Sequence, residues 1–227
     1  MPDINSNPSN ALLIFAKWPE PGRVKTRLSP PLSEQAAADL YRLMLLDTLE
    51  STREIDGIKR LIFFDGDPGR IDDFRALAPD ADVMRQEGAD LGARLANAFA
   101  KAFSMGCQTV AAIGTDSPHM PIERVTEAFD LLNGNGADVV FGPSEDGGYY
   151  LVRMRLFDNA LFRDIPWSSS EVLATSIARA ESSGFKVTLL PTGFDLDTTD
   201  DLLRLKNMAN APAARRTREY LNMAASE

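Results

Sequence analysis

Apolar runs of strand length alternate with segments of helical periodicity along almost the whole chain. We expect strands near residues 11–17, 59–65, 81–85, 108–114, 137–142, 148–153 and 185–190. Helical patterns fall near residues 33–51, 69–78, 90–105, 121–133, 169–183 and 198–209, with another at 212–224. Strands joined by helices run parallel, because each helix carries the chain back across the sheet. The pattern therefore predicts an α/β fold, with a mostly parallel sheet and helices on both faces.

The strands expected at 137–142 and 148–153 depart from this rhythm. The segment PSEDGG joins them, which is too short for a helical crossover, so we expect one antiparallel element and a mixed sheet. With 227 residues, the chain is long enough for one large α/β domain or two small ones. The sequence has no internal repeat and no convincing linker, and we expect a single domain over residues 10–224.

The chain is acidic, with 24 Lys and Arg against 33 Asp and Glu and a formal net charge of −9. This balance argues against nucleic acid or an anionic membrane as the main partner and leaves small molecules. The longest apolar runs have the length of strands, so we expect no membrane span. The polar first ten residues argue against export, and the single cysteine, Cys107, suits a reducing compartment. We therefore expect a cytoplasmic protein, while the sequence indicates no oligomeric state.

Four cations gather where the first predicted strand ends, in the segment LLIFAKWPEPGRVKTRL. They are Lys17, Arg23, Lys25 and Arg27, and Gly22 beside them can adopt a positive φ or let a ligand approach the backbone. Junctions of this kind hold phosphates in α/β proteins, so Lys17, Gly22 and the Lys25–Arg27 pair are candidate phosphate-binding residues. The alternative is a solvated basic loop. The sequence has neither the GxxxxGK[ST] nor the GxGxxG motif.

Three acidic motifs follow other predicted strands, whose carboxyl ends should meet at one edge of the sheet. GTDSP contributes Asp116, SEDGGYY contributes Asp146, and DLDTTDD contributes Asp197. Mg²⁺ is commonly bound by one or two protein carboxylates together with substrate phosphates, so Asp116 and Asp197 are candidate metal ligands. Turn formation alone would also explain Asp116, and a hairpin turn would explain Gly147 and Gly148.

Weaker signals lie elsewhere in the chain. Asp90 and Arg94 stand at a loop-to-helix junction where they could contact a base or ribose, although helix capping would also explain Asp90. Trp167 either packs on the domain or flanks an acceptor pocket. Residues 198–201 have the character of a capping box. The only histidine, His119, has no second His or Cys for a zinc site, and we expect it on the surface of a loop.

Six motifs in fixed order resemble a known bacterial family: FAKWPEPGRVKTRL, DLGARLANAF, GTDSP, GPSEDGGYYL, IPWSSS and DLDTTDDL. The family has the GT-A fold and lies in the nucleotide-diphospho-sugar transferase superfamily. Some members are called radical-SAM-associated transferase 1 or arsenosugar-biosynthesis-type glycosyltransferases. The resemblance implies a three-layer α/β/α domain with a mixed sheet, which binds a nucleotide-activated donor together with Mg²⁺ or Mn²⁺.

The resemblance also implies roles for individual residues. Asp116 and Asp197 match the metal-side aspartates, and Lys17, Lys25 and Arg27 match the basic loop near the phosphates. The family's turn near the acceptor or sugar is matched by Asp146, Gly147, Gly148 and Tyr149, with Trp167 beside it. Two departures stand out: Ser117 replaces a cysteine common in relatives, and the LAGGxxxRxG loop of sugar nucleotidyltransferases is absent.

Two reactions are compatible with these residues, and a third possibility is a nucleotide-binding module without turnover. The first is glycosyl transfer from a nucleoside-diphosphate sugar to a small acceptor, with Asp146 activating the acceptor and Lys25 and Arg27 neutralising the diphosphate. The alternative is nucleotidyl transfer, which releases pyrophosphate from a nucleoside triphosphate. The KTRL stretch is loosely similar to phospholactate guanylyltransferase-like proteins, which favours the alternative. We expect a transferase, with glycosyl transfer first.

Overall fold

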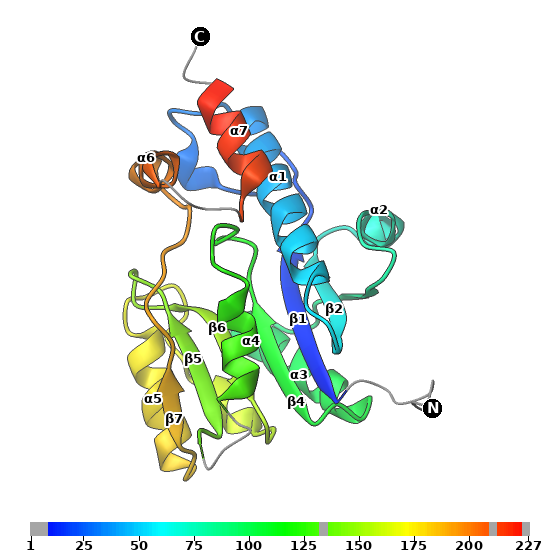
Figure 1. Ribbon diagram of the computed structural model, residues 1–227, viewed down its shortest axis with the longest axis vertical. Coiled ribbons are helices and arrows are strands. Elements are labelled where there is room, and N and C mark those ends of the chain that lie inside the picture. Colours follow the sequence, from blue (N-terminus) through cyan, green and yellow to red (C-terminus); the bar gives the residue numbers. More distant parts are fainter. Residues whose placement is uncertain (1–8, 132–135, 209–212, 224–227) are drawn as a thin grey trace.

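The computed structural model of the chain describes residues 9–131, 136–208 and 213–223. Within these residues, seven strands form one sheet in the order β3-β2-β1-β4-β6-β5-β7 (Figure 1). The strands are β1 (Asn10–Lys17), β2 (Ile58–Asp65), β3 (Asp82–Arg85), β4 (Thr109–Ile113), β5 (Val139–Pro143), β6 (Tyr149–Met154) and β7 (Val187–Leu189). Strand β6 is antiparallel to β4 and β5, and the other neighbours run parallel. The predicted α/β fold with a mixed, mostly parallel sheet is confirmed.

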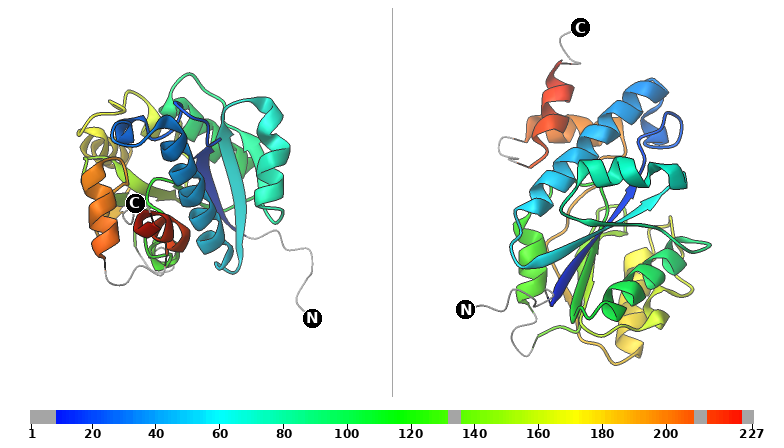
Figure 2. Two further views of the ribbon diagram at one scale, coloured as in Figure 1. Left: turned by 90° about the horizontal axis from the view of Figure 1, so that it is seen from above. Right: turned by 90° about the vertical axis from the view of Figure 1, so that its right-hand side faces the viewer.

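Helices cover both faces of the sheet and complete the three layers (Figure 2). They are α1 (Glu34–Arg53), α2 (Ile71–Leu77), α3 (Leu91–Ser104), α4 (Glu123–Asp130), α5 (Val172–Ser182), α6 (Thr199–Asn207) and α7 (Arg215–Met223). One face packs against α1, α2 and α4 through a core that includes Leu45, Phe74 and Phe129. The other packs against α3 and α5 through residues that include Phe99 and Ala180. No helix among the described residues combines the length and apolarity needed to cross a bilayer.

Helix boundaries differ from the sequence-based expectation mainly where the chain enters a helix. The helices expected from 121 and 169 begin only at Glu123 and Val172. The expected helix at 69–78 divides into a 3₁₀ turn (Pro68–Arg70) and α2. The predicted boundaries at 133, 209, 212 and 224 lie outside the described residues.

Strand directions bring the polar motifs to one edge of the sheet. Strands β1 and β4 are parallel neighbours, with Ile14 opposite Ile113, so the loops that follow them leave the sheet side by side. Strand β6 runs the other way, with Leu151 opposite Ile113, and its first residue, Tyr149, therefore lies at the same edge. The β5–β6 turn lies at this edge together with the loops after β1 and β4. Most of the polar side chains singled out from the sequence are therefore at this edge.

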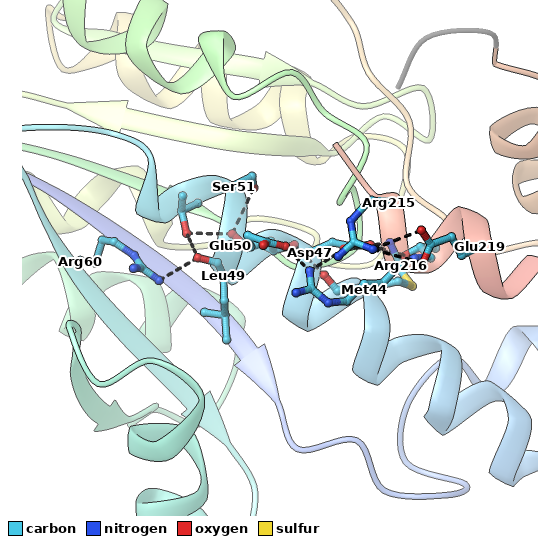
Figure 3. Close-up of polar contacts among 12 residues, drawn as sticks. Met44, Asp47, Leu49, Glu50, Ser51, Arg60, Arg215, Arg216 and Glu219 are labelled. Atoms are coloured by element: carbon cyan, nitrogen blue, oxygen red, sulfur yellow. Dashed lines mark hydrogen bonds and ion pairs between the residues drawn. The ribbon is translucent and has the colours of Figure 1, made fainter. Parts of the chain in front are cut away.

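The C-terminal helix α7 is fastened to α1 by a buried carboxylate (Figures 1 and 3). Asp47, which is 4% exposed, accepts hydrogen bonds from the backbone N–H groups of Arg216 (3.1 Å) and Thr217 (2.9 Å). The Thr217 hydroxyl donates to the same side chain at 2.8 Å. Arg216 also contacts Asp47 and the exposed Glu50. Because the first N–H groups of a helix have no partner within it, Asp47 caps α7 from a neighbouring helix.

His119 is buried under the segment that leads into α6, so the expected surface position is wrong. Its ring lies 4.1 Å from that of Phe194, and the guanidinium of Arg204 lies 3.8 Å from the Phe194 ring centre. Burial and the charge of Arg204, against the opposing charge of Asp201, together lower the pKa of His119 to about 4. The imidazole is therefore neutral in the folded protein near neutral pH.

The Asp47 contacts predict a large and specific loss of stability on Asp47→Asn. In the wild type, the donors of α7 share the two carboxylate oxygens of Asp47. An asparagine would replace one of these oxygens with an NH₂ group that cannot accept, so the substitution should lower the free energy of unfolding by about 2–3 kcal/mol. The control, Asp72→Asn, removes an exposed i,i+3 ion pair with Arg75 and should change it by less than about 0.5 kcal/mol. Urea unfolding measures both, and similar losses in the two variants would contradict the capping role.

The buried His119 predicts a pH-dependent stability. The unfolded chain takes up a proton near pH 6.5, whereas the folded protein does so only near pH 4, so acid favours unfolding between these values. Relative to a His119→Phe variant, the wild type should lose about 3 kcal/mol between pH 8 and pH 4. Urea unfolding of both proteins across this range gives the difference directly. A difference that does not vary with pH would show that His119 titrates normally.

Candidate active site

A cleft of about 720 Å³ opens at the edge of the sheet where the polar motifs meet. Its walls come from the loop after β1, the start of α3, the loop after β4, the β5–β6 turn, and the segments before α5 and α6. Ten residues predicted for the site line it: Lys17, Lys25, Arg27, Arg94, Asp116, Asp146, Gly148, Tyr149, Trp167 and Asp197. The fold thus brings together most of the residues selected from the sequence.

Three predicted residues are not among those that line the cleft, and each has a structural contact. Gly22 adopts φ 72° beside Glu34, as the turn requires. Asp90 caps α3 by accepting a hydrogen bond from the Ala93 N–H at 2.8 Å. Gly147 adopts φ 89°, and a Cβ there would lie 2.2 Å from the carbonyl oxygen of Ser170. Gly22, Asp90 and Gly147 therefore shape the walls without facing the cleft.

Lys25 lies between the two predicted metal-side aspartates. Its ammonium nitrogen is 2.5 Å from Asp116 Oδ1 and 2.9 Å from Asp197 Oδ1, and its side chain is only 3% exposed. Arg27 approaches the other Asp197 oxygen at 3.6 Å and is 70% exposed. Burial alone would lower the pKa of Lys25, but the charges of Asp116 and Asp197 outweigh it and raise the pKa above its ordinary value. Lys25 is therefore a permanently charged bridge between two loops.

The loop that carries Lys25 is held by apolar anchors on both sides of it. Val24 packs with Ala38 and Tyr41, and Leu28 joins a separate cluster formed with α1 and α6. Between the anchors, Lys25 adopts a left-handed backbone conformation with φ 48° and ψ 39°, just before a 3₁₀ turn (Thr26–Leu28). Such a conformation is uncommon for a residue with a side chain. It directs the lysine inward while Arg27 stays exposed.

Asp195 is a buried carboxylate that the sequence-based site did not include. It accepts hydrogen bonds from the hydroxyl of Ser117 and, at 3.1 Å, from that of Ser144. Burial raises the pKa of Asp195 to about 6, although the hydrogen bond from Ser117 acts to lower it. Next to it, the Leu196 N–H donates to the Asp116 carbonyl at 2.9 Å. These contacts hold the segment before α6 against the loop after β4 and so bring Asp197 next to Asp116.

Tyr41 is a second residue of the cleft that no motif indicated. Its hydroxyl accepts a hydrogen bond from the Lys17 N–H at 2.9 Å and lies 2.8 Å from the Thr115 hydroxyl. Burial and the charge of Asp116 raise the pKa of Tyr41 to about 12, so it stays protonated. Because it reaches from α1 to the ends of β1 and β4, Tyr41 fixes the floor of the cleft. In the sequence it is one of many apolar positions of a helix.

The opposite wall is aromatic. The Tyr149 ring lies 5.1 Å from Phe141 and 6.3 Å from Trp167, in an edge-on arrangement with the latter. Burial raises the pKa of Tyr149 above its ordinary range, so its hydroxyl stays protonated. Ser168, with φ 68°, turns the chain so that residues 168–170 also line the cleft. Asp146 stands at the edge of this wall, where Asp146 Oδ1 accepts a hydrogen bond from the Gly148 N–H at 2.8 Å.

The end of the cleft near α3 combines apolar and fixed polar groups. Leu91 is a large apolar side chain left 43% exposed there. The amide of Gln86 donates to the carbonyl oxygens of Phe63 and Ala16, and Arg94 is held by an ion pair with Asp65 at 2.8 Å. The predicted junction near residues 86–94 therefore lies at the cleft through Gln86 and Arg94, with Asp90 behind them.

The carboxylates of the cleft fit a divalent cation only together with another ligand. Within the described residues, no group of three or more His, Cys, Asp or Glu side chains has the arrangement of a metal site. Asp116 and Asp197 nevertheless direct one oxygen each at the same cation, the Lys25 ammonium. Mg²⁺ commonly uses one or two carboxylates and completes its shell with phosphates and water. The pair therefore suits a metal that arrives with a phosphorylated ligand.

Comparisons with known proteins identify the family and the fold. The family model described as "Uncharacterized protein conserved in bacteria (DUF2064)" matches residues 48–169. A crystal structure of a Desulfovibrio desulfuricans G20 protein, provisionally named a nucleotide-diphospho-sugar transferase, is 33% identical to this chain. The match covers 97% of this chain and 96% of that one, with a TM-score of 0.90. No curated protein matches the chain.

More distant solved structures share the fold alone. A cytidylyltransferase from Leptospira borgpetersenii is 14% identical, with a TM-score of 0.57 over 97% of this chain and 96% of that one. A nucleotidyl transferase from Methanothermobacter is 13% identical, with a TM-score of 0.53 over 95% and 98% of the two chains. The expected nucleotide-diphospho-sugar transferase fold is thus confirmed, and the chain belongs to the DUF2064 family of bacterial proteins.

Proposed function

We propose that this protein is a metal-dependent transferase that moves a glycosyl group from a nucleoside-diphosphate sugar to a small acceptor. The observation that carries the proposal is the composition of one cleft. One part of its lining holds Lys25 and Arg27 against two aspartates, and another part is an aromatic wall that Asp146 precedes in the chain. The first set of residues suits a metal diphosphate, and the second suits a neutral acceptor.

The family supports a transferase, because its Desulfovibrio member carries that provisional name at 33% identity over nearly the whole chain. The fold is also shared with a cytidylyltransferase and a nucleotidyl transferase, whose names imply nucleotide substrates for those proteins. A fold by itself does not prove an activity, so the proposal depends on the cleft. Nucleotide donors and small acceptors are the expected partners.

Asp116 and Asp197 are the residues that would hold Mg²⁺ or Mn²⁺. When bound, such a metal supplies positive charge that offsets the charge developing on the departing diphosphate. Lys17 and Arg27 would bind the phosphate oxygens directly, and Arg27 is exposed enough to reach them. These cations line a cleft. Charges in a cleft are screened less than charges in open solvent.

Asp146 is the proposed general base for the acceptor hydroxyl. The Gly148 N–H holds one of its oxygens, which fixes the carboxylate within the lining of the cleft. Tyr149 and Trp167 would pack against the acceptor, because broad aromatic faces suit the apolar faces of sugars and similar small molecules. A carboxylate beside such a wall can take the proton of a hydroxyl group as it attacks the sugar carbon.

Nucleotidyl transfer is the second candidate, and the shared fold with two nucleotide transferases favours it. In this reaction a phosphate or carboxylate of the acceptor attacks the α-phosphate of a nucleoside triphosphate. Lys25 and Arg27 would then stabilise the leaving pyrophosphate instead of a nucleoside diphosphate. Both reactions use the same basic and acidic residues and differ in the product that leaves.

The two candidates are separated by a donor panel followed by product analysis. We expect one class of nucleoside-diphosphate sugar, together with Mn²⁺, to raise the melting temperature by mass action. Incubation of that donor with sugar, polyol and phenolic acceptors should then release free nucleoside diphosphate faster than slow hydrolysis does. Release of pyrophosphate from a nucleoside triphosphate would instead identify the second candidate. Failure of all donors and triphosphates to bind would contradict both.

Loss of either metal-side aspartate should remove the metal-dependent part of binding. Asp116→Asn and Asp197→Asn are each expected to lower the Mn²⁺-dependent affinity for the identified donor by at least about 100-fold. The control is Asp72→Asn, on the exposed face of α2, which should leave the affinity unchanged. Isothermal titration with and without Mn²⁺ measures the effect. Retained metal dependence in both active-site variants would exclude the proposed ligands.

A further inference from the structure

We propose that Lys25 and a divalent cation exchange places in the Asp116–Asp197 pair, so that the site accepts the metal only together with a diphosphate. In the structure, the lysine ammonium lies between the two carboxylates. When a metal diphosphate enters, the ammonium leaves the carboxylates and moves onto the phosphate oxygens. This inference rests on the proposed function and adds the order in which its components bind.

The contacts around Lys25 support competition for the same oxygen atoms. The ammonium touches Oδ1 of both Asp116 and Asp197, the two carboxylates that are proposed to hold the metal. The lysine side chain is 3% exposed, whereas the Asp116 and Asp197 side chains are 50% and 37% exposed. A cation therefore reaches the carboxylates from the open side of the cleft, while the lysine approaches them from within the protein.

Repulsion between cations gives the reason why metal and diphosphate should enter together. The Lys25 ammonium already contacts Asp116 and Asp197, and Arg27 approaches Asp197 from solvent. A divalent cation added alone would meet the positive charge of Lys25 at the same two carboxylates, which disfavours its binding. A diphosphate added alone would face the two carboxylates. Only the combined ligand supplies the carboxylates with a cation and the displaced ammonium with an anion.

The fold allows the exchange without movement of the loop. Val24 and Leu28 anchor the chain on either side of Lys25, so the backbone can stay in place. The lysine side chain is flexible, and the cleft of about 720 Å³ gives the ammonium space on the side where the phosphates would lie. Arg27 forms an ion pair with Asp197 from a largely exposed position and is not enclosed in the same way.

The test measures Mn²⁺ binding directly, by counting free Mn²⁺ with electron paramagnetic resonance. Wild type and Lys25→Met are titrated without and with inorganic pyrophosphate, with correction for the metal pyrophosphate complex in solution, and Lys17→Met is titrated without pyrophosphate. Lys17 lines the same cleft, and no ion pair among the described residues joins it to either aspartate, so it controls for general electrostatics. The readout does not require turnover.

Without pyrophosphate, Lys25→Met should bind Mn²⁺ at least about tenfold more tightly than the wild type, and Lys17→Met should differ by less than about threefold. Pyrophosphate should strengthen Mn²⁺ binding at least about tenfold in the wild type and less in Lys25→Met, which has no ammonium to transfer. An unchanged Mn²⁺ affinity in Lys25→Met, or equal changes in both variants, would overturn the exchange.

Two further results keep the inference separate from the proposed reaction. Tighter Mn²⁺ binding in Lys25→Met, with no pyrophosphate binding to the wild type, would overturn both the transfer to phosphate and the proposed function. Pyrophosphate binding without any effect of Lys25 on Mn²⁺ binding would overturn the exchange alone.

If Lys25→Met does not unfold cooperatively, Lys25→Arg replaces it. The bidentate guanidinium should then weaken Mn²⁺ binding relative to the wild type, and no weakening would contradict the competition.

Discussion

A buried ammonium between two carboxylates is the interaction on which the cleft depends. Lys25 comes from the loop after β1, and its partners Asp116 and Asp197 come from the loop after β4 and the segment before α6. Without the lysine, the two carboxylates would repel each other across a partly desolvated space, and a buried charge without a partner is strongly destabilising. The ion pairs thus set the separation of three chain segments as well as the charge of the site.

The sheet explains why residues so distant in sequence meet at this point. Strands β1 and β4 are neighbours at its centre, and both end at the same edge. The reversed strand β6 adds the β5–β6 turn to that edge, which brings Asp146 and the aromatic wall to the same cleft as the cations. A fully parallel sheet would place the start of β6 at the far edge. The single antiparallel strand is therefore a requirement of the site.

Local patterns were sufficient to predict much of this architecture. Alternation of apolar runs with helical periods predicted the strands to within a few residues, and the short turn between two of them predicted the antiparallel pair. The capping box at the start of α6, formed by Thr198 and Asp201, was also predictable, because both partners lie within one turn of helix. Strand-end motifs likewise predicted the residues that line the cleft, since a parallel sheet gathers such ends.

Tertiary contacts account for what the sequence did not reveal. The basic loop suggested a phosphate site, but nothing local indicated that Lys25 turns inward onto Asp116 and Asp197 while Arg27 stays outside. Tyr41 contributes through a hydroxyl that meets Lys17 and Thr115 only after α1 packs on the sheet. His119 was expected on a loop surface, and it is buried because a segment about 75 residues later covers it.

The charges of the cleft also indicate which of its residues could distinguish glycosyl transfer from nucleotidyl transfer. Glycosyl and nucleotidyl transfer both use a donor with linked phosphates, so the part of the cleft that contains Lys25, Asp116 and Asp197 would serve either proposed reaction equally well. The reactions differ in whether a hydroxyl attacks a sugar carbon or an anion attacks a phosphorus atom. An anionic acceptor would need a cation next to it, and the opposite wall instead combines Tyr149 and Trp167 with a carboxylate, Asp146. A carboxylate repels an anionic attacking group and can deprotonate a neutral one, which is the physical reason to place glycosyl transfer first.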